Sequence, residues 1–417
     1  MVRDHVIPIE IILMVIDELS WRGDLETLVA LSETCHVFNI PCRKRIFSKI
    51  ALGVQQEFLD AGILALTIPN MNEIFSSTPS IATYVHRATI NITNTDLNGN
   101  LLLPLLKKLN SLTNLRLTSE IAWNANISEN WKDMSPAMEL CVKHLLQIPS
   151  LFELEIFRLQ RIPISLFAAI PQVRHLRLHA STISSRLIET QPATIPTPIC
   201  SPLTLLDIRR KSINSIHRIT LDNRHVDFSG LKELYISLEE RTDMLFLHKF
   251  LKAIKALDLL SVNSICLISD MSVSNLMTAP SLTHVRELKL EYSEGRWNRS
   301  EHLLKATLEA LLAIQNKGEL ERLSVQIRCL TVLKENLAEG LESLDTVLAD
   351  PEFRNLSRVA LCIEPAFDLV EDEGDETTTT TTTREDLIRH MERLNVHPYR
   401  NFTLDFNFNF IGRKLLR

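Results

Sequence analysis

The side chains that could do chemistry are scattered along this 417-residue chain, and few of them recur at a spacing that catalysis or metal binding requires. The thirteen histidines are dispersed, and the closest approach to a metal-ligand cluster is Cys35-His36 with Cys42. That group lacks the paired spacing of zinc ligands, and Cys35 fits the apolar interior of a helical segment. The sequence has no P-loop, G-x-G-x-x-G, G-x-S-x-G or HExxH motif. We therefore expect no catalytic residue, no metal and no cofactor. A hydrolase triad assembled in space from distant residues is a weaker alternative.

Composition favours a reducing compartment and protein partners. The seven cysteines are odd in number, scattered and without a CxxC, which is typical of free thiols in a cytoplasmic or nuclear protein. The formal net charge of −6 gives no reason to expect nucleic acid as a partner. Acids such as Asp4 and Glu10 interrupt the N-terminal apolar stretch, which disfavours an export signal. No apolar run reaches the length of a membrane span, so we expect no membrane association.

The first fifty residues predict three short helices that carry more apolar surface than they can bury among themselves. Pro8 and Glu10 suit the first turn of the first helix. An inward stripe at i, i+3, i+4 and i+7 follows, with further apolar residues beside it: Ile9, Ile12, Leu13 and Ile16 form the stripe, and Ile11, Met14 and Val15 lie off it. Gly23 breaks the chain, Asp24 is the expected N-cap of the second helix, and a third helix is expected after Pro41.

A helix that is apolar nearly all round must be buried nearly all round, and a segment of this size cannot do so alone. We infer a docking module whose partner supplies the missing cover. The alternative is that these helices only cap the domain that follows.

This stretch resembles the F-box, a family that opens with Leu-Pro-x-Glu-Ile and closes with a Cys-x-x-Phe segment ending in Leu-Phe. The residues that match the family pattern are Ile7, Pro8, Glu10, Ile11, Asp24, Leu25, Cys35, Phe38, Ile46 and Phe47. The resemblance covers about the first fifty residues. It implies binding to a Skp adaptor and, through the adaptor, to a cullin and a RING protein. The residues expected to bind the adaptor are Pro8, Ile9, Glu10, Ile11, Ile12, Val15, Leu25, Leu28, Phe38 and Phe47.

A second pattern, apolar-x-x-apolar-x-apolar, recurs nine times after residue 111 at intervals of 22 to 39 residues. The copies are LTNLRL (112), LFELEI (151), VRHLRL (173), LTLLDI (203), LKELYI (231), LDLLSV (257), VRELKL (285), LERLSV (320) and LSRVAL (356). Degenerate flanking copies begin at residues 84 and 399. The alternation at the end of each copy predicts a strand with one face in a core. Segments that end at proline, such as the one before Pro149, predict a helix between strands. Strands joined in this way run parallel, so the sequence predicts an α/β solenoid.

This array resembles an irregular leucine-rich repeat. The family's Asn or Cys, three positions past the hexamer, is missing from all nine copies. The occupants are Glu120, Leu159, Ser181, Lys211, Glu239, Ile265, Ser293, Arg328 and Glu364. We therefore expect the side-chain ladder of that turn to be absent. By this resemblance, degenerate arrays of this kind behind an F-box are common in fungal proteins.

The third and fifth positions of each hexamer point away from the core and, in parallel strands, line up along a concave face. The candidate target-binding residues on this face are Arg116, Glu155, Arg177, Asp207, Tyr235, Lys289 and Arg322. Their mixed charges suit a protein target, and Tyr and Arg are frequent interface anchors. An ordinary solvated sheet, with recognition by loops, is the competing interpretation.

The predicted domains are an F-box-like helical domain at 1–50, a helical linker at 51–83 and the array at 84–417. An acidic, threonine-rich loop at 370–384 is expected to be disordered. The resulting hypothesis is a non-catalytic substrate-recognition subunit of a Skp–cullin–F-box (SCF) ubiquitin ligase, with an unknown protein substrate. The alternative is a protein-interaction scaffold that uses the F-box only for docking.

Overall fold

The computed structural model describes residues 8–54, 62–92, 99–119, 129–168, 170–184, 203–210, 212–213, 228–264, 274–293, 301–329, 334–365 and 403–408. The chain divides into two compact units. Unit 1 comprises Met1–Ser201 with Asp222–Val226, and unit 2 comprises Pro202–Leu221 with Asp227–Arg417. The predicted loop at 370–384 lies outside the described residues.

Three helices open unit 1: α1 (Ile9–Arg22), α2 (Leu25–Thr34) and α3 (His36–Ile46). Gly23 ends α1 in the left-handed region at φ 74°, which a residue without Cβ adopts at little cost. The predicted N-cap is confirmed, because the Asp24 carboxylate accepts the backbone N–H of Thr27 at 3.0 Å. The third helix starts earlier than predicted and includes Pro41. Residues on both sides of Pro41 pack against the same core, and this packing outweighs the one hydrogen bond that proline removes.

We call residues 9–46 the helical module. Its core consists of Ile16, Leu28, Cys42 and Ile46, with Ile12 and Phe38 among the partly buried residues packed against it. Two expectations are therefore wrong. Cys35 is exposed, and Cys42 is the interior thiol. Ile9 and Leu13, expected on the inward stripe of α1, are exposed.

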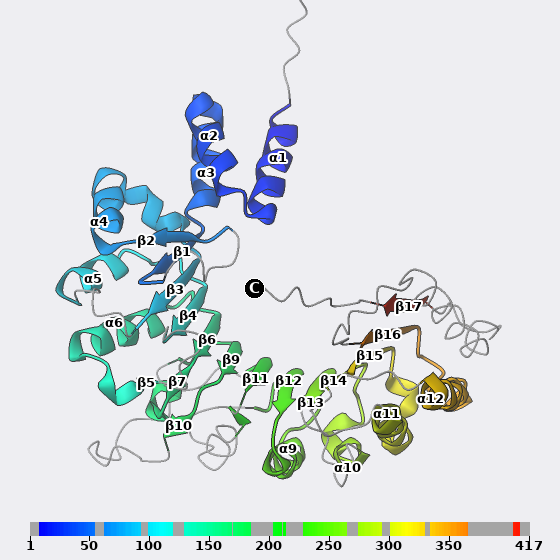
Figure 1. Ribbon diagram of the computed structural model, residues 1–417. Helices are drawn as coiled ribbons and strands as arrows, with labels where there is room; N and C mark the ends of the chain where they lie inside the picture. The colour runs from blue at the N-terminus through cyan, green and yellow to red at the C-terminus, as the bar shows by residue number, and fades with distance from the viewer. Residues whose placement is uncertain are drawn as a thin grey trace, which may run out of the picture. The chain divides into compact units, whose positions relative to one another are not determined.

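The sheet of unit 1 is parallel, with strand order β9-β6-β4-β3-β1-β2. Its strands are β1 (Lys49–Leu52), β2 (Leu64–Leu66), β3 (Arg87–Asn91), β4 (Asn114–Thr118), β6 (Glu153–Phe157) and β9 (His175–His179). The helices between them are α4 (Ile68–Ser77), η2 (Pro79–Tyr84), α5 (Gly99–Leu106), η3 (Trp131–Asp133), α6 (Pro136–Leu146) and α7 (Ser165–Ala168). Figure 1 shows α4, α5 and α6 along one face of these strands.

Two small parallel pairs lie beyond the ends of these strands. β5 (Glu129–Asn130) pairs with β7 (Leu159–Gln160), and β8 (Ile162–Pro163) pairs with β10 (Ile183–Ser184).

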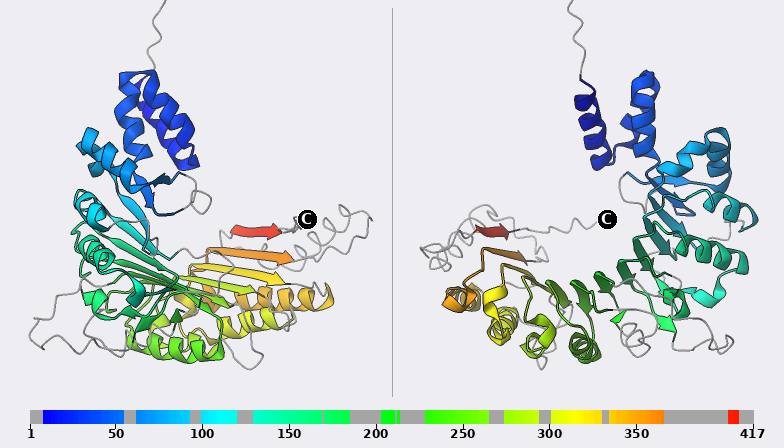
Figure 2. Two further views of the ribbon diagram at one scale, coloured as in Figure 1. Left: turned by 60° about the vertical axis from the view of Figure 1, so that its left-hand side comes forward. Right: turned by 180° about the vertical axis from the view of Figure 1, so that it is seen from behind.

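Unit 2 repeats the architecture with strand order β17-β16-β15-β14-β13-β12-β11, again parallel. Its strands are β11 (Leu205–Arg209), β12 (Glu233–Leu238), β13 (Leu259–Ser264), β14 (Glu287–Ser293), β15 (Arg322–Cys329), β16 (Arg358–Pro365) and β17 (Thr403–Phe408). The helices are α9 (Arg241–Ala253), α10 (Ser274–Met277), η4 (Pro280–Leu282), α11 (Glu301–Ala313), η5 (Lys317–Glu319), α12 (Lys334–Leu348) and η6 (Pro351–Phe353). Figure 2 shows the helices of unit 2 on one side of its strands.

The predicted repeat is confirmed strand by strand, because all nine hexamers and both flanking copies contain or adjoin a parallel strand. The alternation is also confirmed: in β4, for example, Leu115 and Leu117 are buried while Asn114 and Arg116 are partly accessible. The expected helical linker at 51–83 is wrong in part. It contains β2 and the end of β1, so the sheet starts at Lys49 and not at residue 84. These two strands are short, and their sequence has no full hexamer to identify them.

The missing Asn or Cys at the turn is replaced in one repeat by serine. The Ser181 hydroxyl is buried, accepts the N–H of Leu159 at 3.2 Å and lies 2.9 Å from the carbonyl oxygen of His179. The expectation that the ladder is absent is therefore wrong at this position. Left-handed backbone conformations occur just before this position, at Ala180 (φ 51°), and one repeat earlier, at Arg158 (φ 59°).

Candidate protein-interaction surfaces

The first candidate surface is α1, whose apolar side chains remain exposed within the described part of the chain. Ile11, Met14 and Val15 are 49%, 66% and 50% exposed, and Trp21 is also exposed. Ile11 and Val15 are four residues apart, so they are neighbours on one side of the helix. The expected surplus of apolar surface is thus present, and burying it against a partner would gain about 25 cal/mol for each Å² removed from water.

The ten residues expected to bind the adaptor fall into three groups. Those exposed on α1 or at its start are Pro8, Ile9, Glu10, Ile11 and Val15. Those partly buried against the module core are Ile12, Leu25, Phe38 and Phe47. Leu28 alone is fully buried, at 0% exposed, between Ile16, Cys42 and Ile46. Leu28 is therefore corrected from a docking residue to a core residue. In a stripe with apolar residues on several sides, periodicity cannot tell which residue faces inward.

The second candidate surface is the face of each sheet opposite to the helices, which we call the open face. The strand register places side chains from successive strands in rows across it. In unit 1 one row joins Thr89, Arg116, Glu155 and Arg177, and the next joins Lys49, Arg87, Asn114, Glu153 and His175. In unit 2 one row joins Asp207, Tyr235, Ser261, Lys289, Ser324 and Ala360. The predicted alignment of hexamer positions three and five is confirmed within each unit.

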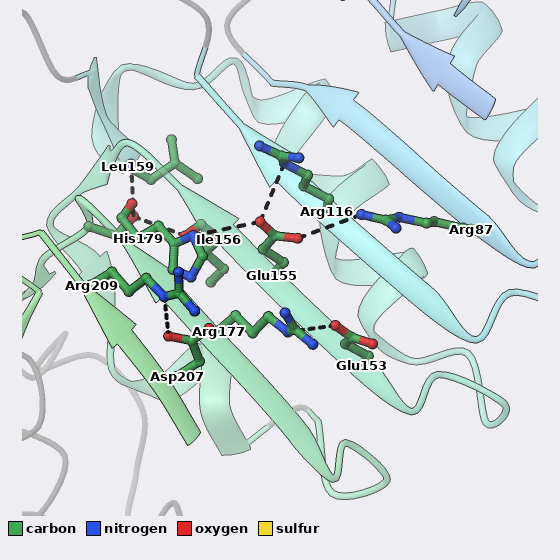
Figure 3. A network of polar contacts seen from close by, with 11 residues as sticks. Arg87, Arg116, Glu153, Glu155, Ile156, Leu159, Arg177, His179, Asp207 and Arg209 are labelled. Atoms are coloured by element: carbon green, nitrogen blue, oxygen red, sulfur yellow. Dashed lines mark hydrogen bonds and ion pairs between the residues drawn. The ribbon is translucent and has the colours of Figure 1, made fainter. Parts of the chain in front are cut away.

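On the open face of unit 1, ion pairs converge on two carboxylates (Figure 3). Glu155 lies 3.6 Å from Arg116 Nε, 3.9 Å from Arg87 Nη2 and 3.8 Å from His179 Nδ1. Its side chain is only 13% exposed, so these charges attract each other more strongly than at a fully solvated surface. Arg177 Nε lies 2.8 Å from Glu153 Oε1. Figure 3 shows Glu155 between the three cationic or ionisable groups, with Arg177 and Glu153 beside them.

An aromatic ring borders this network. The guanidinium of Arg116 lies over the ring of Phe157, 5.0 Å from the centroid, and that of Arg158 lies 5.3 Å from it. His179 approaches the same ring edge-on at 6.2 Å. Stacking on Phe157 limits the side-chain orientations of Arg116 and so holds its charge at the surface of the sheet.

The open face of unit 2 carries a more acidic cluster. Glu287 pairs with Lys289 at 2.8 Å and with Arg322 at 2.6 Å. The Tyr235 hydroxyl donates to Glu233 at 3.2 Å, and the Lys289 ammonium lies 5.9 Å from the Tyr235 ring centroid. Burial, followed by the negative charge of Glu233, raises the pKa of Tyr235 to about 12.

Six of the seven candidate target-binding residues remain accessible to some degree on these faces. Arg116 and Glu155 pair with each other, and Lys289 and Arg322 share Glu287. Tyr235 contacts Lys289 through its ring and Glu233 through its hydroxyl, whereas Arg177 pairs with Glu153, outside the predicted set. Asp207 is the exception. It is 2% exposed and its carboxylate pairs with Arg209 Nε at 2.9 Å, so it is corrected to a residue that holds Arg209 in place.

The candidate list omitted the acids and the arginine that organise these clusters. Glu153, Glu233 and Glu287 occupy the third hexamer position, which the alternation places on this face, and Arg87 lies in register with Asn114, the third position of the next copy. Arg116–Glu155 and Arg322–Glu287 join directly opposed positions of one row. Arg87–Glu155 and Arg177–Glu153 run diagonally, from one row to the next on another strand, and no spacing in the sequence encodes these two pairs.

The described helices include none with both the length and the apolar character of a membrane span. Where the structure describes side chains, no three His, Cys, Asp or Glu residues are grouped as metal ligands.

Comparisons with known proteins identify no close relative. No protein-family model matches the chain, and no curated protein matches it. Among the solved structures that match is an internalin from Listeria monocytogenes, at 12% identity and a TM-score of 0.29, covering 94% of this chain and 91% of that one. A TM-score of this size does not establish a shared fold. The description of the protein as an α/β array of parallel strands and helices therefore rests on its own strand register.

Proposed function

We propose that this chain is the substrate-recognition subunit of an SCF ubiquitin ligase, with the helical module docking a Skp adaptor and the sheet binding a protein target. The observation that carries the proposal is the exposed apolar surface of α1, where Ile11 and Val15 lie beside each other. The order and spacing of the F-box-like residues support the same partner. The chain itself would break no bond. It would act by proximity, raising the concentration of target lysines near the ubiquitin-charged enzyme.

The experiment is capture of purified Skp adaptor by the full-length chain. Val15→Asp places a charge in the apolar surface and, because Val15 is half exposed, leaves the module folded. We expect adaptor binding to fall by about 100-fold, since burying an uncompensated carboxylate costs several kcal/mol. The matched control is Leu245→Asp, because Leu245 is also an apolar helix residue, 64% exposed, but lies in α9 of unit 2.

Retention of the adaptor by Val15→Asp, or an equal loss with Leu245→Asp, would count against the proposal. The scaffold alternative is separated by a second readout. Purification of the chain from cells should recover a cullin along with the adaptor if it serves a ubiquitin ligase, and the adaptor without a cullin if it is a scaffold.

A further inference from the structure

We propose that the open face of unit 1 binds an extended, acidic segment of a protein target through Arg87, Arg116 and Arg177. This inference deepens the proposed function, since it assumes that the sheet is the target-binding surface.

The open face of unit 1 carries a surplus of positive charge. The rows across β1 to β9 carry four cations, Lys49, Arg87, Arg116 and Arg177, against two carboxylates, Glu153 and Glu155. The surplus is positive although the whole chain has a formal net charge of −6. The corresponding rows of unit 2 from β11 to β14 carry three carboxylates, Asp207, Glu233 and Glu287, against one cation, Lys289. An acidic segment is therefore attracted to the face of unit 1 and repelled from that part of unit 2.

Arg116 and Arg87 are poorly satisfied by the one carboxylate that they share, Glu155. Arg116 Nε is buried and has no hydrogen-bond acceptor among the described residues, because the nearest oxygen of Glu155 is 3.6 Å away. Arg87 reaches Glu155 only at 3.9 Å. A guanidinium group offers five N–H donors and pairs best with a carboxylate at about 2.8 Å. Both side chains are partly exposed, at 26% for Arg116 and 35% for Arg87, so a carboxylate supplied by a target could pair with the exposed part of each guanidinium group.

The three arginines lie close enough together for one short segment to contact them all. Arg87, Arg116 and Arg177 lie on β3, β4 and β9, and β6 with Glu155 lies between the last two. Three strand spacings amount to about 14 Å, which an extended chain crosses in about four or five residues. A short acidic segment lying across the strands can thus contact all three arginines.

Within this arrangement Glu155 and Glu153 compete with the target for the same arginines. Removing a competing carboxylate should tighten binding, whereas removing an arginine should weaken it. A sheet position with a purely structural role would not produce a gain when its charge is neutralised.

The experiment measures binding of fluorescein-labelled peptides of about ten residues, a length that spans the face, to the full-length chain by fluorescence polarisation. The probe alternates glutamate and serine; the comparison peptides alternate lysine and serine, or phosphoserine and glycine. We expect the glutamate peptide to bind, the lysine peptide not to bind, and the affinity for the glutamate peptide to fall as salt rises.

The variants then assign the site. Arg116→Ala and Arg87→Ala should each weaken binding of the glutamate peptide by about tenfold, and Glu155→Gln should tighten it by about threefold. Arg322→Ala is the matched control, because Arg322 is also an arginine paired to a sheet glutamate, but on unit 2. It should change affinity by less than about twofold. Glu153→Gln, which frees Arg177, serves as the second gain-of-affinity variant if Glu155→Gln misfolds.

The inference is overturned if Arg116→Ala and Arg87→Ala bind as wild type, if Arg322→Ala loses as much, or if neither glutamine variant binds more tightly. Binding of the phosphoserine peptide without the glutamate peptide would also overturn it, in favour of a phosphorylated target. Adaptor capture separates the two proposals: if the wild-type chain captures the adaptor but does not bind the glutamate peptide, this inference alone is contradicted.

Discussion

The helical module and the open face of unit 1 both present surface that the described chain does not cover, and their chemistry is opposite. On α1 many of the exposed side chains are apolar, as with Met14 and Val15. On the sheet they are charged and already paired, as with Glu155 and Arg116. Covering the first surface gains free energy from any apolar partner of matching shape. Covering the second gains little unless the partner replaces the ion pairs it disturbs.

This difference indicates that the two surfaces bind different kinds of partner. A surface that binds through apolar area suits a constant partner, such as an adaptor common to many complexes. A surface that binds through fixed charges discriminates among partners, because a segment of the wrong sign is repelled. The comparison can be tested by substitutions that affect one surface and leave the other unchanged.

The largest expected effect is the difference in stability between a core variant and a docking-surface variant of the helical module. Leu28→Ala removes a fully buried side chain and should destabilise the module by about 3 kcal/mol. Val15→Ala shortens a half-exposed side chain and should change stability by less than about 0.5 kcal/mol. Hydrogen exchange of residues 9–46 in the full-length chain measures both. Equal exchange in the two variants would show that Leu28 is not the centre of the module's core.

The sheet surface is expected to respond to charge and pH instead. The pKa of Tyr235, about 12, lies above the ordinary value of about 10, so the folded chain keeps this proton in a pH range where the unfolded chain loses it. The stabilising contribution is complete below pH about 10 and is lost as the pH rises through about 12.

Glu233→Gln should lower this pKa but not restore it fully to about 10, because burial, the larger cause, remains. The measurement is an ultraviolet titration of tyrosinate absorbance, comparing Glu233→Gln with Glu321→Gln, a carboxylate not among the causes of the Tyr235 shift. Superimposable curves for wild type and Glu233→Gln would refute the assigned influence of Glu233.

The sequence predicted the sheet better than the module because strand periodicity leaves two choices of face, and the leucines of each hexamer select one. The rows containing Arg116 and Tyr235 follow from that choice. In α1 apolar residues occupy several sides, so the inward side depends on α2 and α3, and Leu13 was misplaced for this reason. Burial of Asp207 could not be predicted either, since it depends on the side chains around it in the folded sheet.

The diagonal ion pairs were beyond sequence reasoning for a different reason. Arg87 reaches Glu155 across an intervening strand, and Arg177 reaches Glu153 on a neighbouring row. Which of several nearby acids an arginine contacts depends on its side-chain torsions, and packing against neighbours restricts these, as the Phe157 ring does for Arg116.

The smallest expected effect concerns the left-handed backbone positions of the two regions. The module uses glycine there, at Gly23 (φ 74°), whereas a strand end of the sheet uses Ala180 (φ 51°). The left-handed conformation costs a residue with Cβ about 1–2 kcal/mol. Replacing such a residue with glycine removes this cost, but the greater conformational entropy of glycine in the unfolded chain offsets part of the gain in stability. Ala180→Gly should therefore stabilise unit 1 by about 0.5 kcal/mol, and Gly23→Ala should destabilise the module by about 1 kcal/mol. Denaturant unfolding of the full-length chain, with hydrogen exchange to localise each change, tests the pair. If both substitutions changed stability in the same direction, backbone strain would not be the cause.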